Sequence, residues 1–320
     1  MFILSKNQHL STITIMSSFH HYKPTGRAVL PAIGINKKLH DPSLYVPSAG
    51  LASAVNVALN LGQPLLLTGE PGTGKTELAQ HIAWFFQLGK PLVFNAQTTS
   101  VAKDLFYRYD ALGHFQYSQT QQKSLTPEDI ETKFIRYQAL GDAIRQNLRT
   151  VVLLDEIDKA PRDLPNDVLA ALEELRFDVP EIGKTYETSA DNRPIIVMTS
   201  NSEKNLPDAF LRRVIYYHIS FPDSEALLRI VAAKVEGYAE KDLMQVIAHF
   251  ENIRRRKLRK NPATAELIQW AALLYRMEFP AHKLEHPDKL TSAEQESLRI
   301  SYSVLAKGKE DLGILISSLS

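Results

Sequence analysis

The sequence is informative first through what it lacks. The 320-residue chain has no cysteine, which excludes disulfides and thiolate metal sites and is typical of a cytoplasmic protein. No apolar run approaches the roughly 18 to 20 residues that a membrane-spanning helix requires, so we expect no membrane partner. The formal net charge is only +1, so no overall field draws the chain onto nucleic acid. With 44% hydrophobic and 23% charged residues, the composition is that of an ordinary globular protein.

Acidic residues are also absent from residues 1–40, where prolines and glycines break up any regular pattern. A transit peptide is acid-poor too, but it is rich in arginine, and this segment contains only Arg27. The apolar run Phe2–Leu4 is too short for a signal peptide. We therefore expect residues 1–40 to be a flexible N-terminal leader, with Met16 as an alternative start.

Apolar patterns of two kinds alternate through the first two thirds of the chain. Helical spacing predicts helices at 48–61 and 77–88. Short apolar runs predict buried strands at 64–68, 91–95, 151–154, 195–199 and 214–220. This order is typical of a parallel sheet with crossover helices, that is, an α/β fold. The Gln-, Ser- and Thr-rich segment 116–131 predicts an exposed loop or an insertion.

From Ser224 onward no strand pattern occurs, and apolar residues keep helical spacing to the end of the chain. We place a domain boundary near Phe221–Pro222. The expected organisation is therefore a leader at 1–40, an α/β core at 41–222 and a small all-helical domain at 223–320.

A glycine-rich turn between the first predicted strand and its helix fits the pattern G-x-x-x-x-G-K-[ST]. Its residues are Gly69, Glu70, Pro71, Gly72, Thr73, Gly74, Lys75 and Thr76. Glycines let the backbone N–H groups turn inward around a phosphate, and the following helix adds its positive end. Lys75 supplies a charge for the β- and γ-phosphates, and the Thr76 hydroxyl is a Mg²⁺ ligand. The sequence therefore predicts an ATP and Mg²⁺ site.

Acidic and amide side chains follow two other predicted strands. Asp155 and Glu156 stand at the carboxyl end of 151–154, where ligands bind in open parallel sheets. We expect Asp155 to hold Mg²⁺, partly through water, and Glu156 to orient and polarise the attacking water. Asn201 follows 195–199 and can hydrogen-bond that water or the γ-phosphate. The alternatives are an acidic helix start for the carboxylates and a turn asparagine for Asn201.

Taken together, these motifs resemble an AAA+ ATPase of the MoxR family. The telling stretches are Leu153–Ala160, Leu169–Glu174, Thr199–Asn201 and Leu206–Arg213, and the similarity runs from about Tyr45 to the C-terminus. The resemblance implies an AAA+ core followed by a helical lid, with Asn201 as the sensor-1 residue. It also implies that Arg213, with Arg212 beside it, is the arginine finger that reaches a neighbouring subunit's ATP. The alternative is that both arginines solvate a helix end.

The same resemblance implies a homo-oligomer, most commonly a hexameric ring, that acts on a protein client. Such ATPases often work with a von Willebrand factor A domain protein, and Leu258–Trp270 resembles the subset associated with carbon monoxide dehydrogenase maturation. Segments 106–115 and 177–193 resemble two insertions of the family, and we expect both to be exposed and hairpin-like. Asn261–Ala263 departs from the family, because Ala263 stands where other members carry a nucleotide-sensing arginine; Arg259 or Lys260 are candidate substitutes.

Two rival functions belong to other classes. Arg254–Lys260 holds six basic residues in seven positions, which is compatible with a nucleic-acid-remodelling ATPase. No aromatic residue interrupts this run, so we favour a solvated helix face or subunit contact and expect no nucleic-acid partner. A nucleotide-binding regulatory scaffold is the second rival, against which the presence of Glu156 and Arg213 argues.

Overall fold

The computed structural model describes residues 22, 25, 27, 29, 36–120, 125–161, 163–202 and 206–319. They divide into a sheet unit, Lys37–Glu236 with Asn261–Ile268, and a helical unit, Gly237–Lys260 with 269–319. Most of the expected leader lies outside the described residues. The domain boundaries expected at 40 and 222 stay predictions.

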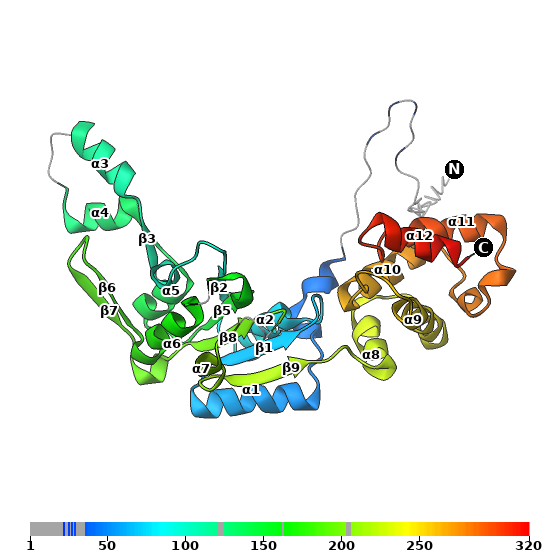
Figure 1. Cartoon of the computed structure of the whole chain (residues 1–320), viewed down its shortest axis with the longest axis horizontal. Helices are drawn as coiled ribbons and strands as arrows, with labels where there is room; N and C mark the ends of the chain where they lie inside the picture. Colours follow the sequence, from blue (N-terminus) through cyan, green and yellow to red (C-terminus); the bar gives the residue numbers. More distant parts are fainter. Residues whose placement is uncertain are drawn as a thin grey trace, which may run out of the picture. The chain divides into compact units, whose positions relative to one another are not determined.

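The sheet unit is built on a five-stranded sheet in the order β2-β5-β8-β1-β9, in which every pairing is parallel (Figure 1). Its strands are β1 Leu65–Gly69, β2 Leu92–Asn95, β5 Val151–Asp155, β8 Ile195–Thr199 and β9 Ile215–Ile219. All five strands expected from the apolar runs are present within one or two residues. The α/β fold with a parallel sheet is thus confirmed.

The central strands are apolar on both faces because helices cover both. Leu65, Leu67 and Leu153 point to one face, where they pack with residues of α1 and α2. Leu66 and Leu154 point to the other face, where they pack with α5 and α6. Alternate side chains of the central strands therefore contribute to two separate hydrophobic cores, one on each face of the sheet.

The helices of the sheet unit follow the predicted crossover order. They are α1 Ala49–Leu61, α2 Lys75–Phe85, α3 Ala111–Thr120, α4 Pro127–Phe134, α5 Ala139–Gln146, α6 Leu164–Glu174, α7 Asp208–Leu211 and α8 Ser224–Lys234. Short 3₁₀ helices are η1 Lys37–His40, η2 Pro42–Leu44, η3 Ala102–Leu105, η4 Ile157–Lys159 and η5 Ala190–Asn192. Ser48 caps α1 by accepting from the Leu51 N–H, and Gly62 ends it in the left-handed region, as the sequence pattern indicates.

Beside the main sheet lie two antiparallel pairs, which with their connecting helices we call the arm (residues 107–137 and 176–187). Tyr107–Tyr109 (β3) pairs with Ile135–Tyr137 (β4), and Arg176–Val179 (β6) pairs with Lys184–Glu187 (β7) (Figure 1). Segment 177–193 thus contains most of a hairpin, β6–β7, whereas 106–115 contains only β3, whose partner β4 lies outside that segment. The expectation that they are exposed is wrong at their bases, because Phe106, Tyr107 and Phe177 are buried and Phe106 and Phe177 stack with ring centroids 4.9 Å apart.

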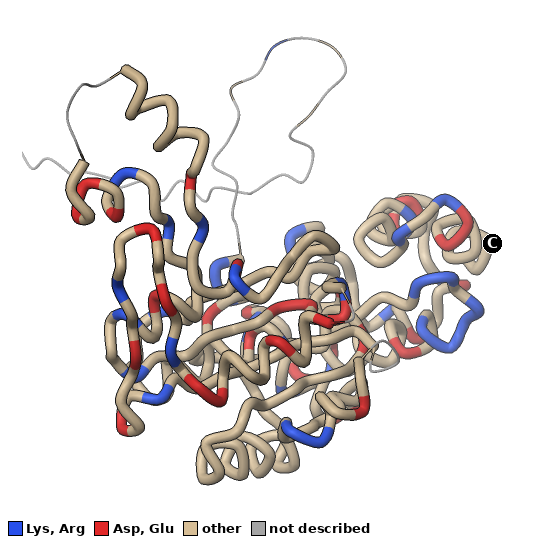
Figure 2. Tube along the Cα trace, turned by 60° about the vertical axis from the view of Figure 1, so that its left-hand side comes forward, with Lys and Arg blue, Asp and Glu red and all other residues tan. Residues whose placement is uncertain are grey.

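Of the two alternatives for 116–131, the loop is wrong, since the described residues belong largely to α3 and α4, which lie between β3 and β4 as an insertion would. Helix α3 has no buried residue and no charged one, so it gives no apolar periodicity to detect (Figure 2). Helix α4 starts with a capping box between Thr126 and Asp129 and with Pro127 in its first turn. Those local signals stabilise the start of the helix, whereas its buried residue, Phe134, lies at the other end.

The helical unit contains α9 Glu240–Arg254, α11 Ser292–Ser301, α12 Lys309–Ser317, η6 Ala281–Glu285 and η7 Pro287–Lys289. Helix α10, Thr264–Arg276, begins in the sheet unit and continues into this one. The core holds Trp270, Phe250 and Tyr302, and Trp270 Nε1 donates to Ser301 Oγ at 2.8 Å. After Ser224 the described residues contain no strand, as expected. None of the described helices has the length and apolarity needed to cross a bilayer.

Candidate active site

The glycine-rich turn joins β1 to α2 at the carboxyl end of the sheet. Gly69 has a φ of 144°, and a Cβ there would come within 2.5 Å of the Ile219 carbonyl oxygen on β9. Gly72 has a φ of 76°, and a Cβ there would come within 2.7 Å of the Ala263 Cβ. Only glycine fits such positions without strain. Thr73 Oγ1 donates to the Glu70 carbonyl oxygen at 2.8 Å, which closes the loop on itself.

Lys75 opens α2 and is only 7% exposed. Its Nζ donates to the carbonyl oxygens of Gly69 at 2.8 Å and Glu70 at 3.0 Å and to Asn201 Oδ1 at 3.0 Å. Burial lowers the pKa of Lys75, while the carboxylates of Asp155 and its neighbours act in the opposite direction. A buried ammonium that bonds to neutral oxygens fits an anionic ligand such as a phosphate.

Asp155 ends β5, and two hydroxyls converge on one of its oxygens. Thr76 Oγ1 donates to Asp155 Oδ1 at 3.1 Å, and Thr199 Oγ1 donates to the same atom at 2.5 Å. A carboxylate and a hydroxyl at this separation are the hard oxygen donors that Mg²⁺ takes, with water completing its shell. The residues present therefore fit the ion that the sequence predicts.

Glu156 has an unusual backbone, with φ 56° and ψ 47°, the left-handed region that costs a non-glycine residue energy. Its N–H donates to Thr199 Oγ1 at 2.8 Å, which holds this conformation in place. Lys159 donates to Glu156 Oε2, and this hydrogen bond lowers the pKa of the carboxyl. Asn201 Nδ2 donates to Oε1 over a long 3.4 Å. Glu156 is thus an ionised carboxylate whose outer oxygen is held by an exposed lysine.

Asn201 links the loop to the acidic residues. Its Oδ1 accepts from Lys75, its Nδ2 donates to Glu156, and its backbone N–H donates to Asp158 Oδ1 at 3.3 Å. A turn asparagine would bond its own neighbours, whereas this side chain bridges two other segments. The structure therefore brings Lys75, Asp155, Glu156 and Asn201 together, and their individual roles stay predictions.

A cavity of about 580 Å³ opens beside the loop. Its walls include Tyr45, Ile219, Ile230 and Ile268, with Gly72, Thr73 and Gly74 at one side. This volume is within the range of small-molecule sites, and an apolar pocket beside a phosphate-sized anion site is what a nucleotide needs.

Arg212 and Arg213 are not part of this cluster. They precede β9, whose first residue Ile215 pairs with Leu65, whereas its last residue Ile219 pairs with Gly69. The strand's rise from Ile215 to Ile219 alone spans roughly 13 Å. The Arg213 side chain is 57% exposed, and its Nη1 lies 3.9 Å from Glu173 Oε1. Both arginines therefore lie toward the end of the sheet opposite the loop.

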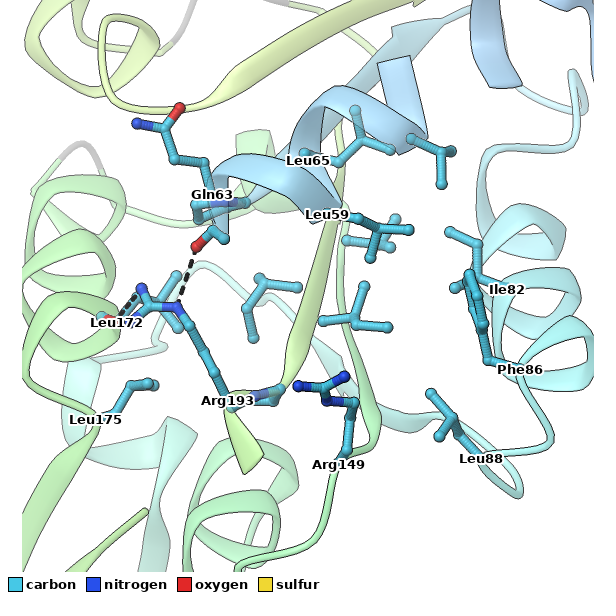
Figure 3. Close-up of a pocket in the computed structure, with 18 of the residues that line it drawn as sticks. Leu59, Gln63, Leu65, Ile82, Phe86, Leu88, Arg149, Leu172, Leu175 and Arg193 are labelled. Carbon is cyan, nitrogen blue, oxygen red and sulfur yellow. Dashed lines mark hydrogen bonds between the residues drawn. The ribbon is translucent and has the colours of Figure 1, made fainter. Parts of the chain in front are cut away.

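That opposite end holds a second cavity of about 500 Å³, lined by Leu59, Leu65, Ile82 and other apolar side chains (Figure 3). Arg193 borders it and donates to the carbonyl oxygens of Gly62 at 3.0 Å and Leu172 at 3.1 Å. This cavity contains none of the predicted site residues.

The sequence analysis missed three contributors to the cluster. Thr199 lies at the end of β8, two residues before Asn201, so its place beside Asp155 follows from the parallel pairing of β5 and β8. Lys159 lies three residues after Glu156, a spacing that allows their contact. The approach of Ala263 to Gly72 joins residues far apart in the chain, and no local signal predicts it.

Residues 64–214 match the model of the AAA domain, dynein-related subfamily. The gas vesicle ATPase GvpN of Haloferax mediterranei is 26% identical over 210 residues, which cover 62% of this chain and 58% of that protein. The chaperone protein ClpB of Prochlorococcus marinus is 30% identical over 141 residues, 42% of this chain and 14% of that protein. The solved FIGL-1 AAA domain in complex with ADP aligns with 85% of this chain and 87% of that chain, with 15% identity and a TM-score of 0.43.

The matched residues include the whole glycine-rich loop, Asp155, Glu156 and Asn201, and they end just after Arg213. Residues 64–214, just under half of the chain, therefore resemble an AAA domain of the AAA+ ATPase type. The chain spans 58% of the length of the GvpN proteins that it matches.

Proposed function

We propose that this protein is a MoxR-type AAA+ ATPase that hydrolyses ATP in a ring assembly in order to remodel or mature a partner protein. The observation that carries the proposal is the cluster at the carboxyl end of the sheet. There a buried ammonium, a hydroxyl–carboxylate pair and a carboxylate on strained backbone lie together beside the glycine-rich loop.

Each group in the cluster has a role that its contacts support. The backbone of the loop and Lys75 hold the β- and γ-phosphates, and Thr76 and Asp155 hold Mg²⁺, which offsets phosphate charge. Glu156 is ionised, so it can accept a proton from an attacking water once Lys159 moves aside. Asn201 bonds to both Lys75 and Glu156 and so fixes these two side chains relative to each other.

Of the cations bonded in the cluster, Lys75 lies buried under the loop and Lys159 pairs with Glu156. Arg213 lies toward the other end of the sheet, exposed, with only a long contact to Glu173. A guanidinium there cannot reach its own loop but is available to another subunit. This supports a ring in which each site is completed by a neighbour, most commonly a hexamer.

A protein client is favoured over nucleic acid by the state of the basic run 254–260 in the helical unit (Figure 2). The buried Asp311 accepts from the Arg259 N–H at 2.8 Å and the Lys260 N–H at 3.2 Å, and Glu310 pairs with the Arg259 guanidinium at 3.4 Å. The Arg259 side chain is thus paired with a carboxylate of this chain. A von Willebrand factor A domain partner, and the carbon monoxide dehydrogenase maturation subset, remain the finer form of this proposal.

Two variants test the chemistry. Glu156→Gln should bind ATP with near wild-type affinity and lose about 10²- to 10⁴-fold in turnover, because the water loses its base. Lys75→Ala should lose ATP affinity, because the phosphate charge is no longer matched. The exposed Glu187→Gln and Lys90→Ala are matched controls and should behave as wild type. Wild-type turnover in Glu156→Gln, or undiminished ATP binding in Lys75→Ala, would contradict the proposal.

A further inference from the structure

The position that carries a nucleotide-sensing arginine in similar ATPases holds Ala263, and this alanine touches the phosphate loop. A Cβ built on Gly72 would lie 2.7 Å from the Ala263 Cβ, 3.7 Å from Glu266 Oε2 and 3.9 Å from the Ala265 Cβ. The start of α10 therefore packs against Gly72 of the phosphate loop. The first turn of this helix carries no cationic side chain. Of the two candidate substitutes, Arg259 pairs with Glu310 through its guanidinium, and the Lys260 backbone N–H is bound to Asp311.

The next residue, Thr264, has a buried hydroxyl with nothing to bond. Thr264 is 7% exposed, and its Oγ1 has no hydrogen-bond partner among the described residues. It also lines the 580 Å³ cavity, together with Ala265 and Ile268. A buried hydroxyl without a partner costs free energy, and most such groups in proteins are satisfied. The hydroxyl is therefore placed for a group that enters the cavity.

The N-terminus of α10 has no side-chain cap of its own, which also favours a ligand group in this cavity. The Ala263 carbonyl accepts from the Leu267 N–H at 3.1 Å, which makes Ala263 the N-cap residue. An alanine has no side-chain oxygen to accept from the first-turn N–H groups, as Ser, Thr, Asp or Asn would. The Glu266 carboxylate accepts from the backbone of the N-cap residue itself, the Ala263 N–H at 3.0 Å. The positive end of α10 is thus left facing the cavity and the loop.

We propose that Thr264, at the N-terminus of α10, is a nucleotide-positioning residue that replaces the missing arginine, its hydroxyl donating to an oxygen of the bound nucleoside triphosphate. This inference rests on the proposed function. The acceptor is either a phosphate oxygen or a sugar hydroxyl, since the loop lies on one side of Thr264 and the apolar Ile268 lies one turn further along the same face. A hydroxyl group and a helix N-terminus carry no full charge, so they should bind the nucleotide more weakly than a guanidinium does.

The test compares Thr264→Val with Thr264→Ser and with Thr120→Val, a change at the exposed end of α3 where the hydroxyl bonds only its own helix. Valine keeps the shape and removes the hydroxyl. We expect Thr264→Val to bind ATP about tenfold more weakly, whereas Thr264→Ser and Thr120→Val bind it as wild type does. Without nucleotide, Thr264→Val should melt at or above the wild-type temperature, because an unsatisfied buried hydroxyl has been removed.

Titrations with ADP, 2′-deoxyATP and 3′-deoxyATP identify the acceptor. A loss in Thr264→Val that vanishes with one deoxynucleotide assigns the bond to that sugar hydroxyl, and a loss that persists with both assigns it to a phosphate. Equal ATP affinities for wild type and Thr264→Val overturn the inference and leave the ATPase proposal standing. A wild-type protein that binds no ATP overturns both. A lowered melting temperature of nucleotide-free Thr264→Val with unchanged ATP affinity assigns Thr264 a structural role and also overturns it.

Discussion

Carboxylates gather in two regions of the sheet unit, and the two groups differ in how completely they are satisfied. In the arm, Glu131 accepts from Tyr137 and Tyr186 hydroxyls at 2.7 Å each and from Lys184 Nζ at 2.6 Å. At the candidate active site, Glu156 sits on strained backbone with one exposed lysine and a 3.4 Å bond from Asn201. The first arrangement stabilises a fold, and the second leaves Glu156 available for the role of base that we propose for it.

A second carboxylate reinforces the arm. Glu181, in the turn between β6 and β7, accepts from the Tyr107 hydroxyl at 2.8 Å and from Lys103 Nζ at 3.2 Å. Each of the two glutamates thus joins the two parts of the arm, residues 107–137 and 176–187. The comparison teaches that changes in the arm should alter stability with little effect on chemistry, whereas changes at the active site should do the reverse.

The largest effect is expected where the active site is incomplete. Arg213→Ala should bind ATP almost normally and hydrolyse it about 10³- to 10⁵-fold more slowly, because in the proposed ring Arg213 serves the ATP site of a neighbouring subunit. Mixing this variant with Lys75→Ala, also inactive, should restore some turnover, since some interfaces then pair an intact loop with an intact arginine. Steady-state ATPase assays of the single variants and the mixture measure this.

The same assay locates the arginine. Rescue with Arg212→Ala in the mixture, but not with Arg213→Ala, would move the finger one residue earlier. Turnover that does not depend on protein concentration, together with no rescue in either mixture, would rule out a shared site.

Much of the active site could be predicted because its signals are local. The loop 69–76 stands between a strand and a helix in the sequence, and Asp155 and Glu156 end an apolar run, so parallel pairing alone brings them to one edge. The carboxyl ends of β5 and β8 also place Asn201 there. These inferences need the order of elements and no detail of packing.

The arm and the start of α10 could not be predicted in this way. Helix α3 buries none of its side chains, so periodicity is absent although the helix is present. The contact between Gly72 and Ala263 depends on how the chain returns after α9, which is a tertiary effect. Only the capping box at Thr126 was a usable local signal that our loop assignment overlooked.

A matched pair of glycines sharpens the comparison at intermediate magnitude. Gly72 in the loop and Gly183 in the arm have φ values of 76° and 64°, but only Gly72 meets a neighbour, Ala263. Alanine at either position should destabilise the folded state by about 1–2 kcal/mol, because its Cβ disfavours a positive φ. Gly72→Ala should add about 1–3 kcal/mol from overpacking, and it should also weaken ATP binding.

Chemical denaturation and ATP titration of both variants measure these differences. Adding Ala263→Gly to Gly72→Ala should recover the overpacking part, because the clashing methyl group is removed. Equal destabilisation by Gly72→Ala and Gly183→Ala, with no recovery in the double variant, would mean that α10 does not press on the loop.

The smallest effect concerns the arm. Burial opposes ionisation of Glu131, but the hydrogen bonds from Lys184, Tyr186 and Tyr137 together lower its pKa from 4.5 to about 2. A carboxyl whose pKa is lower in the folded state stabilises the fold fully above the unfolded pKa, and this contribution is lost as pH falls from about 4.5 to 2. Glu131→Gln should therefore cost about 1–3 kcal/mol at pH 7. The difference from wild type should shrink in acid, whereas ATP turnover at pH 7 stays near the wild-type rate.

Denaturant melts of wild type and Glu131→Gln from pH 7 to pH 3 provide the measurement, with Glu128→Gln, an exposed change on the same helix, as control. A stability difference that stays constant down to pH 3 would mean that the ionised form of Glu131 is not what the arm relies on. A large loss of turnover with no loss of stability would break the comparison itself, because it would make a fully satisfied carboxylate part of the chemistry. The arm would then be coupled to Asn201 through β8, which follows the β6–β7 hairpin in the chain.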